Sequence, residues 1–243
     1  MLKIHSVETF GTHDGPGIRL VVFTQGCMFR CAYCHNPDSQ LWDNPQALQL
    51  SSDDIIAKLE KQKAYFKNGG GITFSGGEPT LQAAELITIC KKIKAKGFHI
   101  TLDTCGAIHT KTTQALYDLC DLVMLDVKHI NQEWHKKLTN QPNDAVLQNA
   151  HYREKTKKEL WLRYVLVPGW TDQEEYLIQW AQYFAAFTTI SKVQILPYHL
   201  LGVHKYAQLG LDYKLEKVRA ATQKDAHRAK KIFEKYLQTV EIA

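Results

Sequence analysis

The sequence has no apolar run that approaches the ~20 residues needed to cross a bilayer. Residues 1–17 also lack the apolar core and small-residue cleavage site of a secretory signal. A basic tract is absent as well: the formal net charge is only +5, and the Lys and Arg residues are scattered. Such a pattern is more typical of a solvated surface than of a nucleic-acid patch. We therefore expect a cytoplasmic protein that binds neither membrane nor nucleic acid.

Low-complexity segments, internal repeats and a linker rich in Pro, Gly or Ser are also missing. A chain of 243 residues is long enough to bury a substantial core. The simplest prediction is a single domain over residues 1–243. The basic stretch at 227–235 has helical spacing with Ile232 and Phe233 inside it, so we expect an amphipathic helix there.

Short apolar runs alternate with segments of helical period. The expected strands are 18–24, 71–75, 98–104, 122–128, 159–167 and 191–198. The expected helices include 51–66, where Ser51 and Asp54 resemble a capping box, and 80–97, which Gly97 closes. Continuous apolar strands separated by helices predict parallel strands covered by crossovers. The fold class is therefore α/β, as an open doubly wound sheet or most of a β/α barrel.

Residues suited to binding a ligand gather where these strands end. In both kinds of α/β fold the ligand binds at the carboxyl ends of the strands. The residues that follow or close the runs are Cys27, Cys31, Cys34, Gly76, Gly77, Glu78, Asp103, Thr104, Asp126, Lys128 and His199. Arg163 is the exception because it lies within the fifth run. The sequence thus predicts one active face.

Three of the six cysteines, Cys27, Cys31 and Cys34, lie within eight positions. Without a secretory signal, clustered thiols more often bind metal or perform chemistry than form disulfides. A C-x3-C-x2-C loop suits a [4Fe–4S] cube, which takes four ligands, and leaves one iron open. A zinc site that adds His35, or three unrelated thiols, remains an alternative, although structural zinc usually joins two separated ligand pairs. The other cysteines, Cys90, Cys105 and Cys120, are expected to be small buried hydrophobes.

Several strand-end residues allow two interpretations. Gly76 and Gly77 permit a close backbone approach to a ligand, or simply a tight turn. Glu78 is able to accept from an ammonium group, or to offset a helix N-terminus. Asp103 and Asp126 end neighbouring strands, and two carboxylates side by side need a cation, a proton or a basic partner.

At the cysteine loop the chain resembles the radical S-adenosylmethionine (SAM) superfamily, whose signature is C-x3-C-x2-C with an aromatic residue before the last cysteine. Tyr33 is that residue here, and Gly-Gly-Glu-Pro at 76–79 resembles the family's segment after the second strand. The flanking segments that add to the likeness are 11–19, 102–106, 124–129, 163–170 and 196–202. From about residue 3 to 215 the chain resembles the short glycyl radical enzyme activases, which act on pyruvate formate-lyase. Residues 35–75 contain none of the extra cysteines that longer activases carry there.

This resemblance implies a fold, two cofactors and a reaction. The fold is a partial (β/α)6 TIM-like barrel in which 25–37 form the cluster loop and a helix and strand in about 213–243 complete the domain. A [4Fe–4S] cluster held by Cys27, Cys31 and Cys34 passes an electron to SAM, and the resulting 5′-deoxyadenosyl radical takes a Cα hydrogen from a glycine of pyruvate formate-lyase. Because cluster and SAM carry this chemistry, no acid–base pair is expected. The resemblance also implies a flavodoxin-type or ferredoxin-type electron donor and a monomer.

The resemblance assigns roles to individual residues as well. The residues implied to bind SAM are Tyr33, Cys34, His35, Asn36, Gly76, Gly77, Glu78, Asp103, Asp126, Val127, Lys128, Arg163 and His199. The residues implied to bind a monovalent cation beside the SAM carboxylate are Asp103, Thr104, Asp126 and, through its carbonyl, Met124. A salt bridge between Asp126 and Lys128 remains open as the ordinary alternative. Asp14, which precedes a turn-forming Gly-Pro-Gly, is implied to help hold the target glycine loop, or it is simply a turn residue.

Other functions remain open at this point. Trp42-Asp43 lacks the glycine pair expected just after it, which leaves partner recognition by residues 38–49 unexplained. A radical SAM enzyme acting on a small molecule would turn over a free substrate without a protein partner. A non-enzymatic iron–sulfur electron carrier would hold a cluster without cleaving SAM, but electron transfer alone needs no ring of polar residues at strand ends.

Overall fold

The computed structural model describes residues 1–243. They form two compact units, one made of residues 1–28 and 39–124 and the other of residues 29–38 and 125–243. None of the helices has the length and apolar character that crossing a membrane requires.

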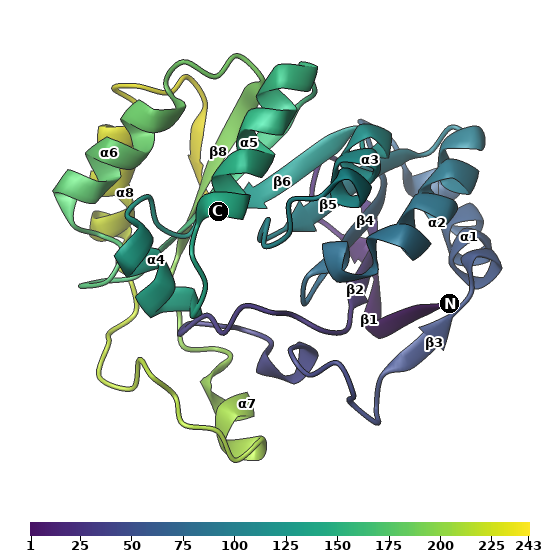
Figure 1. Cartoon of the computed structure of the whole chain (residues 1–243), viewed down its shortest axis with the longest axis horizontal. Helices are drawn as coiled ribbons and strands as arrows, with labels where there is room; N and C mark the ends of the chain where they lie inside the picture. The colour runs from purple at the N-terminus through teal and green to yellow at the C-terminus, as the bar shows by residue number, and fades with distance from the viewer. The chain divides into compact units, whose positions relative to one another are not determined.

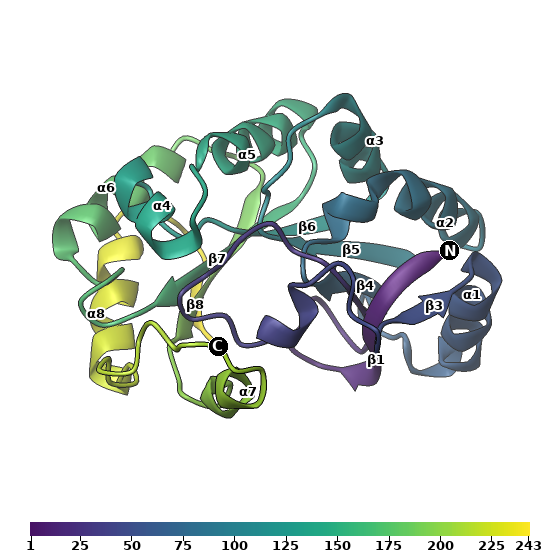
Figure 2. The same cartoon turned by 60° about the horizontal axis from the view of Figure 1, so that its bottom comes forward.

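The first unit is a sheet with helices packed beside it. Its strands are β1 (Leu2–Gly11), β2 (Arg19–Thr24), β3 (Leu48–Leu50), β4 (Gly71–Gly76) and β5 (His99–Thr104). They lie in the order β3-β1-β2-β4-β5; β2, β4 and β5 are parallel, whereas β1 is antiparallel to both of its neighbours. The helices are α1 (Ser52–Lys61), α2 (Ala83–Ala95) and α3 (Lys111–Leu119), with 3-10 turns at Lys63–Tyr65 and Pro79–Gln82. Figure 1 and Figure 2 both show α1, α2 and α3 following one another along one face of β4 and β5.

Two helix bounds in this unit differ from the sequence expectation. The helix predicted over 51–66 begins with the expected Ser51 capping box but ends at Lys61, and a separate 3-10 turn follows. The helix predicted over 80–97 starts only at Ala83, after a 3-10 turn that opens with Pro79. Proline suits the first turn of a helix because its missing N–H needs no partner there. Periodicity alone does not separate such a turn from the helix that follows it.

The second unit also combines parallel strands with helices. Its complete strands, β7 (Leu160–Leu166), β8 (Ile190–Pro197) and β9 (Val240–Ile242), are parallel in that order. Its helices are α4 (Gln132–Thr139), α5 (Asp144–Thr156), α6 (Glu174–Phe184), α7 (Val203–Gln208) and α8 (Gln223–Phe233). Strand β6 (Leu122–Asp126) carries the chain across the boundary, since residues 122–124 belong to the first unit and 125–126 to the second. The 3-10 turn Pro37–Ser39 likewise spans a boundary.

Aromatic packing holds the helices of the second unit on its strands. Trp180 of α6 stacks on Phe233 of α8 with ring centroids 4.8 Å apart, and both side chains are fully buried. Tyr164 of β7 meets both rings edge-on at 5.4 Å. Large rings in such contacts contribute most of the apolar area that a core buries. Figure 1 and Figure 2 show α6 and α8 side by side, so the amphipathic helix predicted from residues 227–235 is confirmed as α8.

All six predicted strands are present, with bounds that differ by at most two residues from the prediction. They correspond to β2 and β4 to β8, and the predicted C-terminal helix and strand are α8 and β9. Strand β1 was not predicted, because most of its second half is partly buried or exposed and it carries no apolar run there. Each predicted strand end therefore belongs to one of the two units.

Candidate functional site

The Gly-Gly-Glu-Pro turn of the first unit supports the start of the cysteine loop. The Gly77 N–H donates to the Thr24 carbonyl (2.9 Å), and the Glu78 N–H donates to the Gly26 carbonyl (2.8 Å). Gly76 has φ +108°, a conformation that side chains rarely adopt. These glycines therefore make the tight turn predicted for them, and the turn is bonded to the residue that precedes Cys27. Their contact with SAM stays a prediction.

The Glu78 carboxylate lies at the centre of a buried hydrogen-bond network. Its side chain is fully buried. Oε1 accepts from Thr80 N (2.9 Å), Thr80 Oγ1 (2.6 Å) and Thr104 Oγ1 (2.7 Å). Oε2 accepts from Cys105 N (2.8 Å) and Cys105 Sγ (2.7 Å). A carboxylate offers about four lone-pair sites, so these donors fill its accepting capacity. The structure thus gives Glu78 partners other than the ammonium group that the sequence suggested, and it joins the turn after β4 to the end of β5.

We expect Glu78→Gln to lower the free energy of unfolding by about 3 kcal/mol, because the amide NH2 must face the donors on one side of the network. Hydroxyl groups can rotate, but the backbone N–H groups of Thr80 and Cys105 cannot. Urea unfolding measured by circular dichroism checks this. Glu85→Gln, at an exposed position of α2, is the matched control and should leave stability unchanged. Equal stabilities for the two variants would contradict the network's importance.

The predicted cation ligands of the first unit are already bonded to protein groups. Asp103 Oδ2 accepts from Ser75 Oγ (2.7 Å). Thr104 Oγ1 donates to Glu78 and accepts from Gly106 N (2.9 Å). Met124 is fully buried. The remaining ligand of the predicted set, Asp126, belongs to the second unit, so the cation site stays a prediction.

Asp14 lies before β2 and contacts the middle of β4. Its carbonyl accepts from Thr73 Oγ1 (2.6 Å), and Thr73 in turn accepts from Arg19 Nε (2.9 Å). The Arg19 side chain is fully buried, and burial lowers its pKa to about 10 in spite of Asp121 and Asp14. Asp14 is therefore part of the packing around a buried arginine, and its predicted contact with the target glycine loop stays a prediction.

In the second unit a carboxylate lies between two cations. Lys128 Nζ donates to Asp126 Oδ2 (3.1 Å), and Arg163 Nε lies 3.8 Å from Asp126 Oδ1. The salt bridge left open by the sequence is thus present. Burial opposes ionisation of Asp126, but Lys128 and Arg163 together hold its pKa below its ordinary value. Two cations around one carboxylate leave a net positive charge, which suits an anionic group such as a ligand carboxylate.

Tyr33 and Val127 flank this charged cluster. The Lys128 ammonium lies 5.5 Å from the centre of the Tyr33 ring, within the range of a cation–π contact. The Tyr33 hydroxyl is buried without a hydrogen-bond partner, and burial raises its pKa well above the usual value. Val127 N donates to the Arg163 carbonyl (3.2 Å), and its own carbonyl accepts from Trp180 Nε1 (3.1 Å). The Tyr33 hydroxyl has no protein partner, so a ligand can supply one. The backbone of Val127 already has protein partners.

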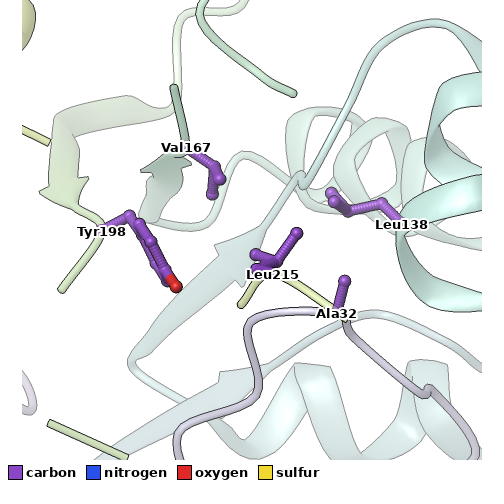
Figure 3. Packing of buried hydrophobic residues seen from close by; sticks show 5 residues of the cluster. All are labelled: Ala32, Leu138, Val167, Tyr198 and Leu215. Carbon is purple, nitrogen blue, oxygen red and sulfur yellow. The ribbon is translucent and has the colours of Figure 1, made fainter. Parts of the chain in front are cut away.

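The second half of the cysteine loop is anchored on the end of α4. Arg30 N donates to the Thr139 carbonyl and Ala32 N to the Leu138 carbonyl, both at 2.8 Å. Figure 3 shows the Ala32 side chain among Leu138, Val167, Tyr198 and Leu215, which with it form a buried cluster. Cys34 N donates to the Cys31 carbonyl (3.0 Å), which closes a turn between the two cysteines. Hydrogen bonds therefore fix the loop backbone before Ala32 and after it, in the segment that contains Cys31 and Cys34.

The residues after Cys34 lie against the end of β8 and the segment that follows it. The rings of His35 and His199 meet edge-on with centroids 4.7 Å apart. Burial, together with His199 and Lys205, lowers the pKa of His35, so this imidazole is neutral at pH 7. Asn36 Oδ1 accepts from Lys205 Nζ (2.7 Å). The structure thus brings together His35 and His199, both of which the resemblance implies to bind SAM; their contact with SAM stays a prediction.

The cysteines differ in exposure in the way that an iron–sulfur site requires. None of the six cysteines forms a disulfide; Cys27, Cys31 and Cys34 are partly exposed, whereas Cys90, Cys105 and Cys120 are buried. Thiolates are the usual ligands of a [4Fe–4S] cluster, and partly exposed thiols can lose their protons to bind it. The chemistry of these three donors therefore suits the cluster; Cys27 belongs to the first unit, and Cys31 and Cys34 belong to the second. Cys90 and Cys120 match the expected small hydrophobes, but Cys105 also donates to Glu78, a role that the sequence did not suggest.

Comparison with known proteins decides the family. The sequence model of the Radical SAM superfamily matches residues 21–181. A pyruvate formate-lyase-activating enzyme of Streptococcus mutans is 42% identical over 235 residues, 94% of this chain and 89% of its own. The chain belongs to the radical SAM superfamily, in the family of the pyruvate formate-lyase-activating enzymes.

Further relatives of the radical SAM family agree with this. The activating enzyme of Listeria monocytogenes is 40% identical over 96% of both chains. A crystal structure of a domain of pyruvate-formate lyase-activating enzyme from Bacteroides vulgatus shares the fold with a TM-score of 0.61 at 24% identity, covering 72% of this chain and 99% of that one. The predicted fold class, an α/β partial (β/α)6 barrel of the radical SAM type, is confirmed. The cofactors are those of the radical SAM family, a [4Fe–4S] cluster and SAM.

Two residues beside the predicted site were missed by the sequence analysis. Lys205 and Tyr206 of α7 contact residues of the cysteine loop, although they lie about 170 positions away in the chain. Their only sequence signal is their place just after the 196–202 segment, which carries the family resemblance. No spacing rule connects two such distant segments before the fold is known.

Proposed function

We propose that this protein is a radical SAM activase that generates a glycyl radical on a pyruvate formate-lyase. The observation that carries the proposal is the kinship with activating enzymes of that name over nearly the whole chain. When bound, the reduced [4Fe–4S] cluster supplies the electron for cleavage of SAM, and the radical so formed takes the Cα hydrogen of the partner's glycine. The protein's own residues bind, orient and shield these groups.

In this proposal Cys27, Cys31 and Cys34 hold the cluster. Their partial exposure and the absence of a disulfide support that role. Lys128 and Arg163, which carry one charge more than Asp126 balances, attract the carboxylate of SAM. The Tyr33 hydroxyl, which is buried without a protein partner, and the Tyr33 ring, which lies near the Lys128 ammonium, bind the same ligand.

Further residues complete this proposal. Gly76, Gly77, Asn36, His35, His199 and Val127 border SAM, and Asp103, Thr104, Met124 and Asp126 bind a monovalent cation. Asp14 helps hold the target glycine loop. The protein acts as a monomer in the cytoplasm, a reducing compartment that suits six cysteines without a disulfide, and receives electrons from a flavodoxin-type or ferredoxin-type donor.

An electron paramagnetic resonance experiment tests the proposal. Anaerobically reconstituted, photoreduced protein is mixed with SAM and an inactive pyruvate formate-lyase, and an organic radical signal is expected. The control is the same partner with its target glycine changed to alanine. This partner should give no such signal, because it lacks the glycine from which the Cα hydrogen is taken. If 5′-deoxyadenosine accumulates without a radical on the partner, the protein acts on another substrate. If an intact cluster gives neither product, the activase function is contradicted and the electron-carrier function becomes the one to pursue.

A further inference from the structure

Helix α7 contacts the part of the cysteine loop that follows Cys34. Tyr206 OH donates to the Cys34 carbonyl (3.1 Å). Lys205 Nζ donates to Asn36 Oδ1 (2.7 Å) and lies 3.4 Å from Asp38 Oδ2. Figure 1 and Figure 2 both show α7 beside the dark purple-blue segment that ends this loop. Three polar groups of the loop, at positions 34, 36 and 38, are thus bound by two neighbouring residues of one helix.

The residue before α7 lies directly on His35. A Cβ at Gly202 would be 2.6 Å from His35 Cδ2 and 2.8 Å from the His35 carbonyl oxygen. Real Cβ atoms do not approach other atoms so closely, so only glycine permits this packing. The start of α7 and the backbone of the cysteine loop are therefore too close for a side chain to fit between them. The contact extends from His35 to Asp38.

Tyr206 is itself fixed by a chain of tyrosines that leads to the core. Its side chain is buried, and its ring meets that of Tyr213 edge-on at 4.8 Å. The hydroxyls of Tyr213 and Tyr198 are hydrogen-bonded (2.6 Å). Tyr198 belongs to the buried cluster that also contains Ala32 (Figure 3). The loop is thus held on one side through Ala32 and on the other through Tyr206, and both supports meet in the same core.

We propose that Lys205 and Tyr206 are positioning residues of the cysteine loop, which hold Cys34 in one orientation before the cluster binds. A metal site whose ligands are already ordered loses less conformational entropy on binding and retains its metal better. This inference rests on the role of Cys34 as a cluster ligand in the proposed function. Neither residue touches the reacting atoms; both act through the backbone and side chains of the loop.

The reactivity of Cys34 in the cluster-free full-length protein tests the proposal. We expect Tyr206→Phe and Lys205→Met each to increase the rate of Cys34 alkylation by iodoacetamide about fivefold, because the loss of one net hydrogen bond makes loop opening easier by roughly that factor. Peptide mass spectrometry follows each cysteine separately. Cys27, whose N–H is bonded to the Gln40 carbonyl, should keep its rate. Cys90 is fully buried and should stay unreactive, which shows that the variant is folded.

Matched variants in the same unit provide the controls. Tyr183→Phe removes a hydroxyl bonded to His151 (2.8 Å), and Lys230→Met removes a surface ion pair with Glu234 (3.6 Å). Neither should change the rate at Cys34. Unchanged Cys34 rates in both α7 variants would overturn the proposal. Should Tyr206→Phe expose Cys90, Lys205→Met decides, because that side chain is partly exposed and its loss leaves no buried gap.

The reconstituted protein supplies a second readout. Both α7 variants should lose iron faster than the two controls when exposed to air, while the intact cluster keeps its electron paramagnetic resonance spectrum when first reduced. Faster alkylation without faster loss of iron would restrict the role of α7 to the cluster-free protein and overturn the claim that it helps retain the cluster. Because alkylation is measured without cluster, SAM or partner, its outcome does not depend on the proposed function.

Discussion

Replacing Cys31 by alanine is expected to abolish both cluster binding and SAM cleavage. The loop offers three thiols, and a [4Fe–4S] cluster that leaves one iron open for SAM needs all of them. Two thiolates hold the cube too weakly to survive reduction, so no electron reaches SAM. Iron and sulfide content, followed by chromatography of 5′-deoxyadenosine, measures both losses.

Cys120→Ala is the matched control for this prediction. Cys120 is buried at the end of α3 and belongs to the same residue type, but it lies outside the loop. This variant should keep its iron and its 5′-deoxyadenosine production, at a small cost in stability from the cavity left by the thiol. A Cys31→Ala variant that still produces 5′-deoxyadenosine would show that the cluster ligands have been assigned wrongly.

The strands were predicted from the sequence because they are continuous apolar runs. In β2, for example, Leu20, Val21 and Val22 are all fully buried, as expected for a parallel strand covered on both faces. Strand β1 carries no such run, since residues near its end are exposed, and it was missed. Helix ends were the other weak point, because the 3-10 turns next to α1 and α2 keep nearly the same periodicity as the helices.

The candidate site was only partly predictable for a different reason. Cys27, Cys31 and Cys34 are close in sequence, and the salt bridge between Asp126 and Lys128 spans two positions, so spacing was informative there. The partners of Glu78 include a backbone N–H and a thiol 27 positions away. Such partners depend on which strands are neighbours in the sheet, and no local sequence pattern predicts them. The sequence suggested an ammonium group or a helix N-terminus as the partner of the Glu78 carboxylate, and neither interpretation includes the thiol and N–H of Cys105.

Replacing Gly77 by alanine is expected to have the second large effect. A Cβ there would lie 2.1 Å from the Gly26 carbonyl oxygen and 3.0 Å from the Ser39 carbonyl oxygen. Gly26 N donates to that Ser39 oxygen (2.8 Å), and Glu78 N donates to that Gly26 oxygen (2.8 Å). The backbone cannot move aside without breaking these bonds. We expect the free energy of unfolding to fall by about 3 kcal/mol or more, which urea unfolding measures.

Gly97→Ala separates this steric effect from the general cost of replacing a glycine. Gly97 has φ +76°, but a Cβ there would meet nothing within 4 Å, so the variant should lose only about 1 kcal/mol. Gly77→Ala should also bind less iron than Gly97→Ala, since Cys27 directly follows Gly26 and its N–H depends on the same pairing, through the Gln40 carbonyl (3.0 Å). Equal stability and equal iron content in the two variants would mean that the turn after β4 does not support the cysteine loop. A loss of iron in Gly77→Ala under conditions where the variant remains folded would instead tie the glycine turn to the positioning of Cys27.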